Sequence, residues 1–173
     1  MAVDWKELAK QVGDLNPDES EKGSGTESGQ RALEILIGEE NLRHAVDYFM
    51  TDAPGAFTVE MLLKVMRSKA AMARCYEIYK MEPGSLRACN AIFLLGSIAD
   101  KKALPWVNEF LEDDYFPVRL NGLKVLQTIL YGPLNDTDIR TAKELLDRAE
   151  SDSHAPVRER ASQMREHFSE VLL

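Results

Sequence analysis

The histidines, cysteines and clustered carboxylates are the residues of this chain that could do chemistry, and their spacing matches no catalytic or metal-binding motif. His44, His154 and His167 form no H-E-x-x-H pattern, which would place two imidazoles on one helix face to bind zinc. Cys75 has no histidine close to it in the sequence to activate it, so a core thiol is the simpler interpretation than a nucleophile. We therefore expect no enzymatic activity, with no catalytic residue, metal or cofactor.

The remaining motif candidates are better explained by structure than by chemistry. Glu39-Glu40 and Asp113-Asp114 fall at expected helix starts or turns, where carboxylates favour the helix dipole. The glycine-rich segment 23–29, GSGTESG, resembles a fragment of a phosphate-binding loop, but its spacing is wrong and no strand precedes it. We interpret that segment as part of a flexible tether.

The charge of the chain argues against a general nucleic-acid-binding protein. The net charge is −8, of which residues 1–30 carry −4 (3 Lys/Arg against 7 Asp/Glu) and residues 31–173 carry the other −4 (18 against 22). Nucleic-acid binding requires a basic surface. The body of the protein is mildly acidic instead, so we do not expect nucleic acid as a partner.

The N-terminus and the apolar segments suggest a cytoplasmic protein without a membrane span. MAVDWKELAKQV has no basic region followed by an apolar run, so it does not resemble a secretory signal. The longest uncharged stretch, residues 88–99, is well short of the ~20 residues that span a bilayer. Cys75 and Cys89 lie in apolar helical contexts, which fits reduced thiols in the cytoplasm.

The hydrophobic pattern predicts an all-α protein in three parts. Residues 1–12 include a short amphipathic helix, and residues 13–28 are acidic, rich in Gly and Ser, and poor in apolar residues, as flexible linkers are. Residues 29–173 form a helical repeat domain, in which prolines, glycines and polar residues separate helix-length segments. The predicted helices there span residues 29–37, 39–51, 56–66, 68–80, 85–98, 101–112, 117–130, 137–149 and 156–171.

These helices form four to five pairs, and their apolar faces require the pairs to stack. The helix at 117–130 has Leu123 and Leu126 on one apolar stripe and Val118 and Val125 on a second. A helix with two apolar stripes is buried on two sides. Each pair therefore needs a neighbouring pair, which is the physical basis of a solenoid.

A repeated motif supports this architecture. The segments DDYFPVRLNG and DSHAPVRERA share an Asp, a short gap, Pro-Val-Arg and a small residue, and their prolines, Pro117 and Pro156, are 39 residues apart. The longer stretch 103–129, ALPWVNEFLEDDYFPVRLNGLKVLQTI, resembles a HEAT repeat. This resemblance implies a right-handed α-α superhelix, and it concerns architecture, because HEAT repeats serve many functions.

The resemblance assigns a structural role to the repeated residues. Proline suits the first turn of a helix because it has no N–H group to lose there. In HEAT repeats the Asp of one turn and the Arg at the next helix start form a ladder, and Asp114, Arg119, Asp152 and Arg158 match those positions. An anion site at Arg119 and Arg158 is the less favoured alternative.

Two features are candidates for binding a partner. The first is a local basic excess over residues 64–87, which includes Lys64, Arg67 and Arg74 and contains only Glu77 and Glu82 as acids. The second is a set of aromatic residues around the expected second helix of a pair. In the HEAT resemblance the second helices line a concave binding face. Trp106 falls off the apolar stripe of its helix, so it is either exposed or packed on a neighbouring helix, and Tyr115 and Phe116 follow in the next turn.

Together these features lead us to expect a scaffold or adaptor that binds another protein through the second-helix face of a small HEAT-like solenoid. A more specific form of this hypothesis is an inhibitor or immunity-type protein that masks a basic toxic partner. The alternative is a HEAT-like nucleic-acid-binding protein or a DNA glycosylase-like enzyme, which would need a basic concave groove. A third class, the tetrapyrrole-binding phycobilin lyase-like proteins, has no feature in the sequence to support it.

Overall fold

The computed structural model describes residues 3–23 and 25–172, and in this part of the chain every regular element except one isolated β-bridge is helical. The bridge joins Leu15 and Glu21 in the segment between the first two helices. The α-helices are α1 (Trp5–Val12), α2 (Thr26–Ile37), α3 (Glu39–Phe49), α4 (Ala56–Met66), α5 (Lys69–Met81), α6 (Leu86–Ile98), α7 (Leu104–Leu111), α8 (Phe116–Leu130), α9 (Asp136–Glu150) and α10 (Ala155–His167), with a 3₁₀ turn, η1 (Lys101–Ala103), before α7.

The prediction of an all-α protein is therefore confirmed, and most predicted helix ends agree with the structure to within two residues, whereas three helices differ more. α2 begins at Thr26 instead of residue 29, because Gly25 serves as its N-cap. The helix predicted over residues 101–112 is divided into η1 and α7, because the Asp100 side chain accepts a hydrogen bond from the Lys102 N–H and Pro105 starts a new helix. α10 ends at His167 instead of residue 171, where Phe168 caps it.

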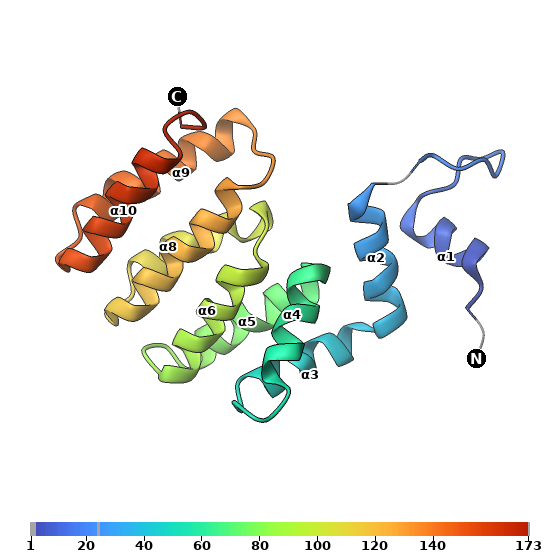
Figure 1. The fold of residues 1–173 in the computed structure, drawn as a ribbon, viewed down its shortest axis with the longest axis horizontal. Helices are drawn as coiled ribbons and strands as arrows, with labels where there is room; N and C mark the ends of the chain where they lie inside the picture. Colours follow the sequence, from blue (N-terminus) through green and yellow to red (C-terminus); the bar gives the residue numbers. More distant parts are fainter. Residues whose placement is uncertain (1–2, 24, 173) are drawn as a thin grey trace. The chain divides into compact units, whose positions relative to one another are not determined.

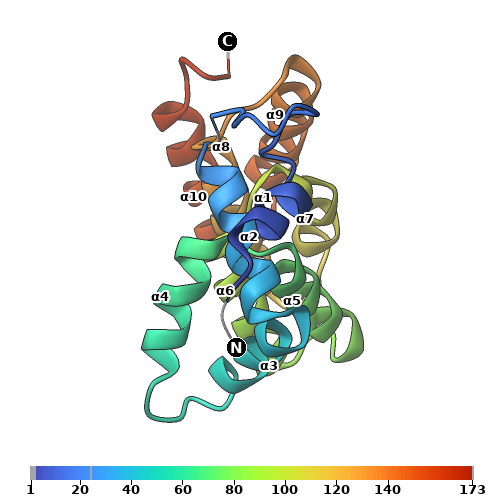
Figure 2. The ribbon, with the colours of Figure 1, turned by 90° about the vertical axis from the view of Figure 1, so that its right-hand side faces the viewer.

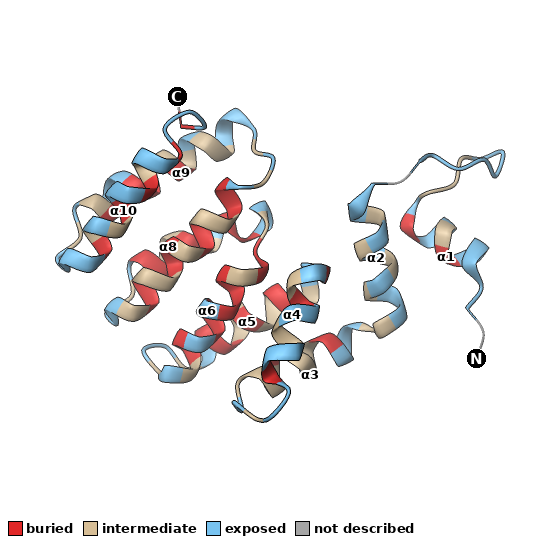
Figure 3. Cartoon of the chain, in the orientation of Figure 1, coloured by how far each residue is buried: buried red, intermediate tan, exposed pale blue. Residues whose placement is uncertain are grey.

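The chain divides into two compact units, Met1–Ala71 and Met72–Leu173. In the first unit, α1 packs on α2, and α2 and α3 each pack on α4. Leu8 and Val12 of α1 are buried, whereas no residue of α2 is buried (Figure 3). Leu42 and Val46 of α3, with Leu63 and Met66 of α4, are almost fully buried in this unit.

In the second unit the helices form two layers. The helices α6, α8 and α10 lie side by side in one layer (Figure 1), while α7 packs on α8 and on α9, and α9 packs on α10. α6 and α8 carry buried residues along much of their length (Figure 3). This burial agrees with the prediction that a helix with two apolar stripes is covered on two sides.

Gly122 allows a close approach between α7 and α8. A Cβ atom at this position would lie 2.9 Å from the Cβ atom of Phe110, which is fully buried in α7. Since real Cβ contacts are longer than this, a side chain at position 122 would force α7 and α8 apart. The small residue predicted three positions after Arg119 is thus required by helix packing.

Within the described residues, no helix is long and apolar enough to cross a membrane.

Candidate functional site

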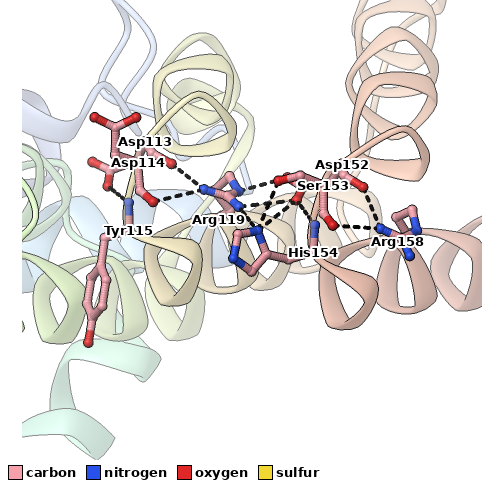
Figure 4. Close-up of polar contacts among 8 residues, drawn as sticks. All are labelled: Asp113, Asp114, Tyr115, Arg119, Asp152, Ser153, His154 and Arg158. Carbon is pink, nitrogen blue, oxygen red and sulfur yellow. Dashed lines mark hydrogen bonds and ion pairs between the residues drawn. The ribbon is translucent and has the colours of Figure 1, made fainter.

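The turn before α8 and the turn before α10 are joined by one buried side chain, that of Arg119 (Figure 4). Arg119 is the fourth residue of α8, and its guanidinium donates to the carbonyl oxygens of Asp113 (2.6 Å) and Asp114 (3.2 Å) in its own turn. It also donates from Nε to Asp152 Oδ2 (2.7 Å) and from Nη2 to Asp152 Oδ1 (3.2 Å) in the next turn. The Arg119 and Asp152 side chains are only 8% and 10% exposed, so water competes little with this ion pair.

The same hydrogen bonds recur 39 residues later. Arg158, the fourth residue of α10, donates to the carbonyl oxygens of Asp152 (2.7 Å) and Ser153 (2.9 Å), as Arg119 does in its own turn. The carboxylate of Asp113 accepts from the Tyr115 N–H (2.8 Å), and that of Asp152 accepts from the His154 N–H (2.7 Å). The equivalent of Asp152 is therefore Asp113, and the Asp114 assigned from the sequence takes part through its backbone carbonyl.

Hydrogen bonds to Asp152 stabilise its charged form. Burial alone would raise the pKa of this carboxyl group, but the His154 N–H and the Arg119 guanidinium outweigh burial and hold the pKa below its ordinary value. Nδ1 of His154 also lies 2.6 Å from Nη2 of Arg119. The imidazole ring of His154 stacks on the Phe116 ring with 5.1 Å between centroids. The Arg119 guanidinium and the Asp152 carboxylate are each bonded to several partners, which indicates a structural brace instead of an anion site.

A second cluster lies on α5 and α7 of the same unit and consists of aromatic rings. The Trp106 indole stacks on the Tyr76 ring with 4.6 Å between centroids and 9° between planes. Beneath them, Tyr79 and Phe110 make an edge-to-face contact at 5.0 Å, with planes 89° apart. Phe110 and Tyr79 are buried, whereas Trp106 and Tyr76 are half-buried. We call Tyr76, Tyr79, Trp106 and Phe110 the aromatic platform.

Glu109 fixes one edge of the aromatic platform. Its carboxylate accepts from the Tyr76 hydroxyl (2.7 Å) and from the Lys80 ammonium (2.7 Å), and these two bonds lower the pKa of Glu109. Burial raises the pKa of Tyr76, and the nearby Glu109 charge raises it further. Burial, with the Asp113 charge next in importance, also raises the pKa of Tyr79, whose hydroxyl donates to the Glu109 carbonyl (3.3 Å). Both tyrosines are therefore neutral hydrogen-bond donors and unsuited to act as bases.

The sequence predicted that Trp106 is either exposed or packed on a neighbouring helix. In the structure it is packed on one side and partly exposed on the other. One ring face covers Tyr76 of α5 while part of the indole remains accessible. Among the described residues, none accepts a hydrogen bond from the indole N–H. Tyr115 and Phe116 are 38% and 36% exposed, and their ring centroids are 6.5 Å apart. Both residues lie where the turn braced by Arg119 meets α8.

The predicted basic excess over residues 64–87 is largely neutralised. Four of its cations form ion pairs, two with Glu77 and Glu82 of the segment itself and two with Glu60 and Glu109 from outside it. Of the three basic candidates, Arg67 is exposed at the C-cap of α4, Lys64 pairs within α4, and Arg74 pairs within α5. Lys64 and Arg67 belong to the first unit, whereas Arg74 belongs to the second. The pairs are Lys64–Glu60 (2.9 Å), Arg74–Glu77 (3.2 Å), Lys80–Glu109 (2.7 Å) and Arg87–Glu82 (2.6 Å).

The sequence did not single out Tyr76, Tyr79 or Glu109. A signal for them does exist, because Tyr76 and Trp106 are 30 residues apart, as are Tyr79 and Glu109. That offset is about one helix pair, so residues at this spacing on successive second helices lie side by side. In the described part of the chain, no group of three or more His, Cys, Asp or Glu residues is arranged to hold a metal ion.

No family model, curated protein or solved structure was found to match this chain.

Proposed function

We propose that this protein is a non-enzymatic scaffold or adaptor, built as a small HEAT-like solenoid, that binds another protein through the aromatic platform on α5 and α7. The architectural part of the proposal is supported by the repeated turn of the second unit. An Arg at the fourth helical position donates to two carbonyl groups of its own turn, both in α8 and in α10. Equal turns in successive pairs are expected when the pairs stack by one repeated rotation.

The observation that carries the binding proposal is the half-buried stack of Trp106 on Tyr76. Tryptophan and tyrosine are the residues most often found as binding anchors, since they offer a large rigid surface at little entropic cost. Here the stack is held in place from below by Phe110 and from the edge by Glu109, so its geometry is set before a partner arrives. The unpartnered indole N–H adds one directional hydrogen bond.

The acidity of the chain favours a basic partner, as the inhibitor or immunity-type form of the hypothesis requires. The net charge of −8 attracts a basic protein from a distance and accelerates its association, an effect that salt weakens. We therefore expect a complex whose association rate falls as salt is raised.

The test is affinity capture of the tagged protein from its native lysate at low salt and at about 150 mM salt, where charges are screened over ~8 Å. The chain with Trp106→Ala is compared with the matched control Tyr131→Ala, a tyrosine of the same unit that is 65% exposed and lies off the platform. A stoichiometric partner retained by Tyr131→Ala and lost by Trp106→Ala supports the proposal. A partner that Trp106→Ala retains would move the binding surface elsewhere, and co-purifying nucleic acid would favour the nucleic-acid class.

A further inference from the structure

The helix α4 has a second apolar side that the first unit leaves uncovered. Phe57, Met61 and Val65 follow one another at four-residue steps and are 71%, 37% and 68% exposed. On the opposite side of the same helix, Leu63 and Met66 are 0% and 1% exposed. We call Phe57, Met61 and Val65 the α4 stripe.

An exposed row of this kind is typical of a contact surface. The neighbouring helices α2 and α3 both pack on α4 and still leave the stripe in water. Figure 2 shows α4 connected to α3 by the loop at residues 50–55. Soluble monomers rarely expose contiguous apolar patches beyond a few hundred Å², because covering such surface is favourable by roughly 25 cal/mol per Å².

The spacing of the stripe indicates that its occupant is a helix. Residues at i, i+4 and i+8 form a ridge that is inclined to the helix axis, and the commonest helix packing interdigitates two such ridges, one from each helix. A second copy of α4 provides the matching ridge by definition.

The charges at the two ends of α4 also fit a second copy. Asp52 is exposed in the loop before the helix, and Arg67 is exposed just after its last turn, whereas Lys64 is paired with Glu60 of the same helix. One end of the stripe is therefore acidic and the other basic. In an antiparallel pair, the acidic end of each copy faces the basic end of the other, and the two helix dipoles are also opposed favourably.

From this ridge and this charge distribution we propose that the α4 stripe is the interface of a symmetric dimer, in which two copies of α4 pack antiparallel. Met61 lies at the two-fold axis and meets Met61 of the second copy, while Phe57 meets Val65. The interface is small, so assembly depends on concentration. This surface is distinct from the aromatic platform, and neither proposal depends on the other.

The first test is the mass of the full chain in solution by sedimentation equilibrium, from about 1 µM to about 1 mM, the range in which a small interface assembles. We expect the wild type to pass from monomer to dimer over this range. Met61→Glu places two carboxylates together at the axis and should weaken the dimer at least about a hundredfold. The matched control is Leu86→Glu, at a leucine that is 70% exposed on α6 and lies off the stripe, and it should dimerise as the wild type does.

The second test is disulfide formation, which does not rely on a destabilising charge. Met61→Cys should cross-link with itself on mild oxidation, because a residue at a two-fold axis faces its own copy. Phe57→Cys and Val65→Cys should each remain monomeric alone and cross-link when mixed. The native Cys75 and Cys89 are buried, so the oxidised wild type is the control.

Three results would overturn the proposal. The first is a wild type that stays monomeric at the highest concentration, including the case in which the stripe binds a different protein. The second is a Met61→Glu variant, shown to be folded by circular dichroism, that dimerises as well as the control. The third is cross-linking of Phe57→Cys or Val65→Cys alone, with none in the mixture, which would exclude the antiparallel arrangement.

Discussion

Removing the guanidinium of Arg119 should destabilise the second unit by about 3 kcal/mol. The side chain makes an ion pair with Asp152 that is about nine-tenths buried and donates to two backbone carbonyls. Removing one partner of a buried pair costs about 3–5 kcal/mol, because the other charge stays buried without compensation. We expect the lower end for Arg119→Met, since Asp152 keeps its hydrogen bond from the His154 N–H.

The assay is urea denaturation followed by the fluorescence of Trp106, in a Trp5→Phe background so that the signal comes from the second unit. Trp5 is 68% exposed, so this background change is mild. The matched control is Arg158→Met. Arg158 donates to the same two carbonyl positions of its own turn and makes no ion pair within the described residues, so its loss should cost about 1 kcal/mol.

A double-mutant cycle separates the ion pair from the other bonds of Arg119. Combined with Asp152→Asn, Arg119→Met should cost at least about 1 kcal/mol less than the sum of the two single changes, because the double variant has no orphaned charge. The reasoning is refuted if Arg119→Met costs no more than Arg158→Met, or if the two changes are additive to within about 0.3 kcal/mol.

Three further changes test other parts of the second unit. The pKa of Asp152 is lower in the folded state than in the unfolded state, so the stabilisation that its charge provides is present above the unfolded pKa and is lost as the pH falls through the folded pKa. The difference in unfolding free energy between the wild type and Asp152→Asn should therefore shrink to nothing in that acidic window. A difference that does not depend on pH would contradict this. Gly122→Ala should lower the unfolding free energy by about 1–3 kcal/mol in urea titrations, because the added methyl group collides with Phe110. This loss is expected even though alanine has a better helix propensity than glycine. A stabilised variant would show that α7 and α8 separate easily. Tyr76→Phe removes the hydroxyl bonded to Glu109 and should lower the unfolding free energy by about 1 kcal/mol in the same titration. The near-ultraviolet circular dichroism of the Trp106 stack should be largely kept. Loss of that signal would mean that the hydroxyl positions the stack.

The helices were largely predictable from the sequence because their boundaries carry local signals. Pro117 and Pro156 mark the first turns of α8 and α10, and the apolar periodicity between such signals predicts each helix. The start of α2 was missed, because Gly25 and Thr26 resemble the preceding linker in composition while serving as its N-cap and first helical residue.

The side-chain partners were less predictable, since they come from distant parts of the chain. The motif indicated Arg119 and Asp152, but local spacing could not decide between Asp113 and Asp114 as the equivalent carboxylate. The ion pairs formed by the basic residues of segment 64–87 were hidden for the same reason. Glu109 lies 29 residues from Lys80, outside any window in which charges along the sequence would be compared.

The arginine of this turn does not recur at the start of α6. Counting from the helix start, the position of Arg119 and Arg158 is the fourth, which in α6 is Cys89. Cys89 is buried and lies 3.3 Å from the side-chain nitrogen of Asn121 in α8, and burial raises its pKa. The repeated arginine bonds are therefore found in α8 and α10 and not in α6.

The bridging position of Arg119 has a consequence for how the second unit unfolds. Its one side chain is bonded at the same time to the turn that precedes α8 and to the turn that precedes α10. When either turn unfolds, Arg119 also loses its hydrogen bonds to the other turn. Part of the free energy of unfolding therefore comes from the junction between neighbouring helix pairs. Such coupling suppresses fraying of α9 and α10. The amide protons of α10 and of α8 should therefore exchange with solvent at a common rate, as one cooperative group. In the Arg119→Met chain the two sets should exchange at separate rates, with α10 first.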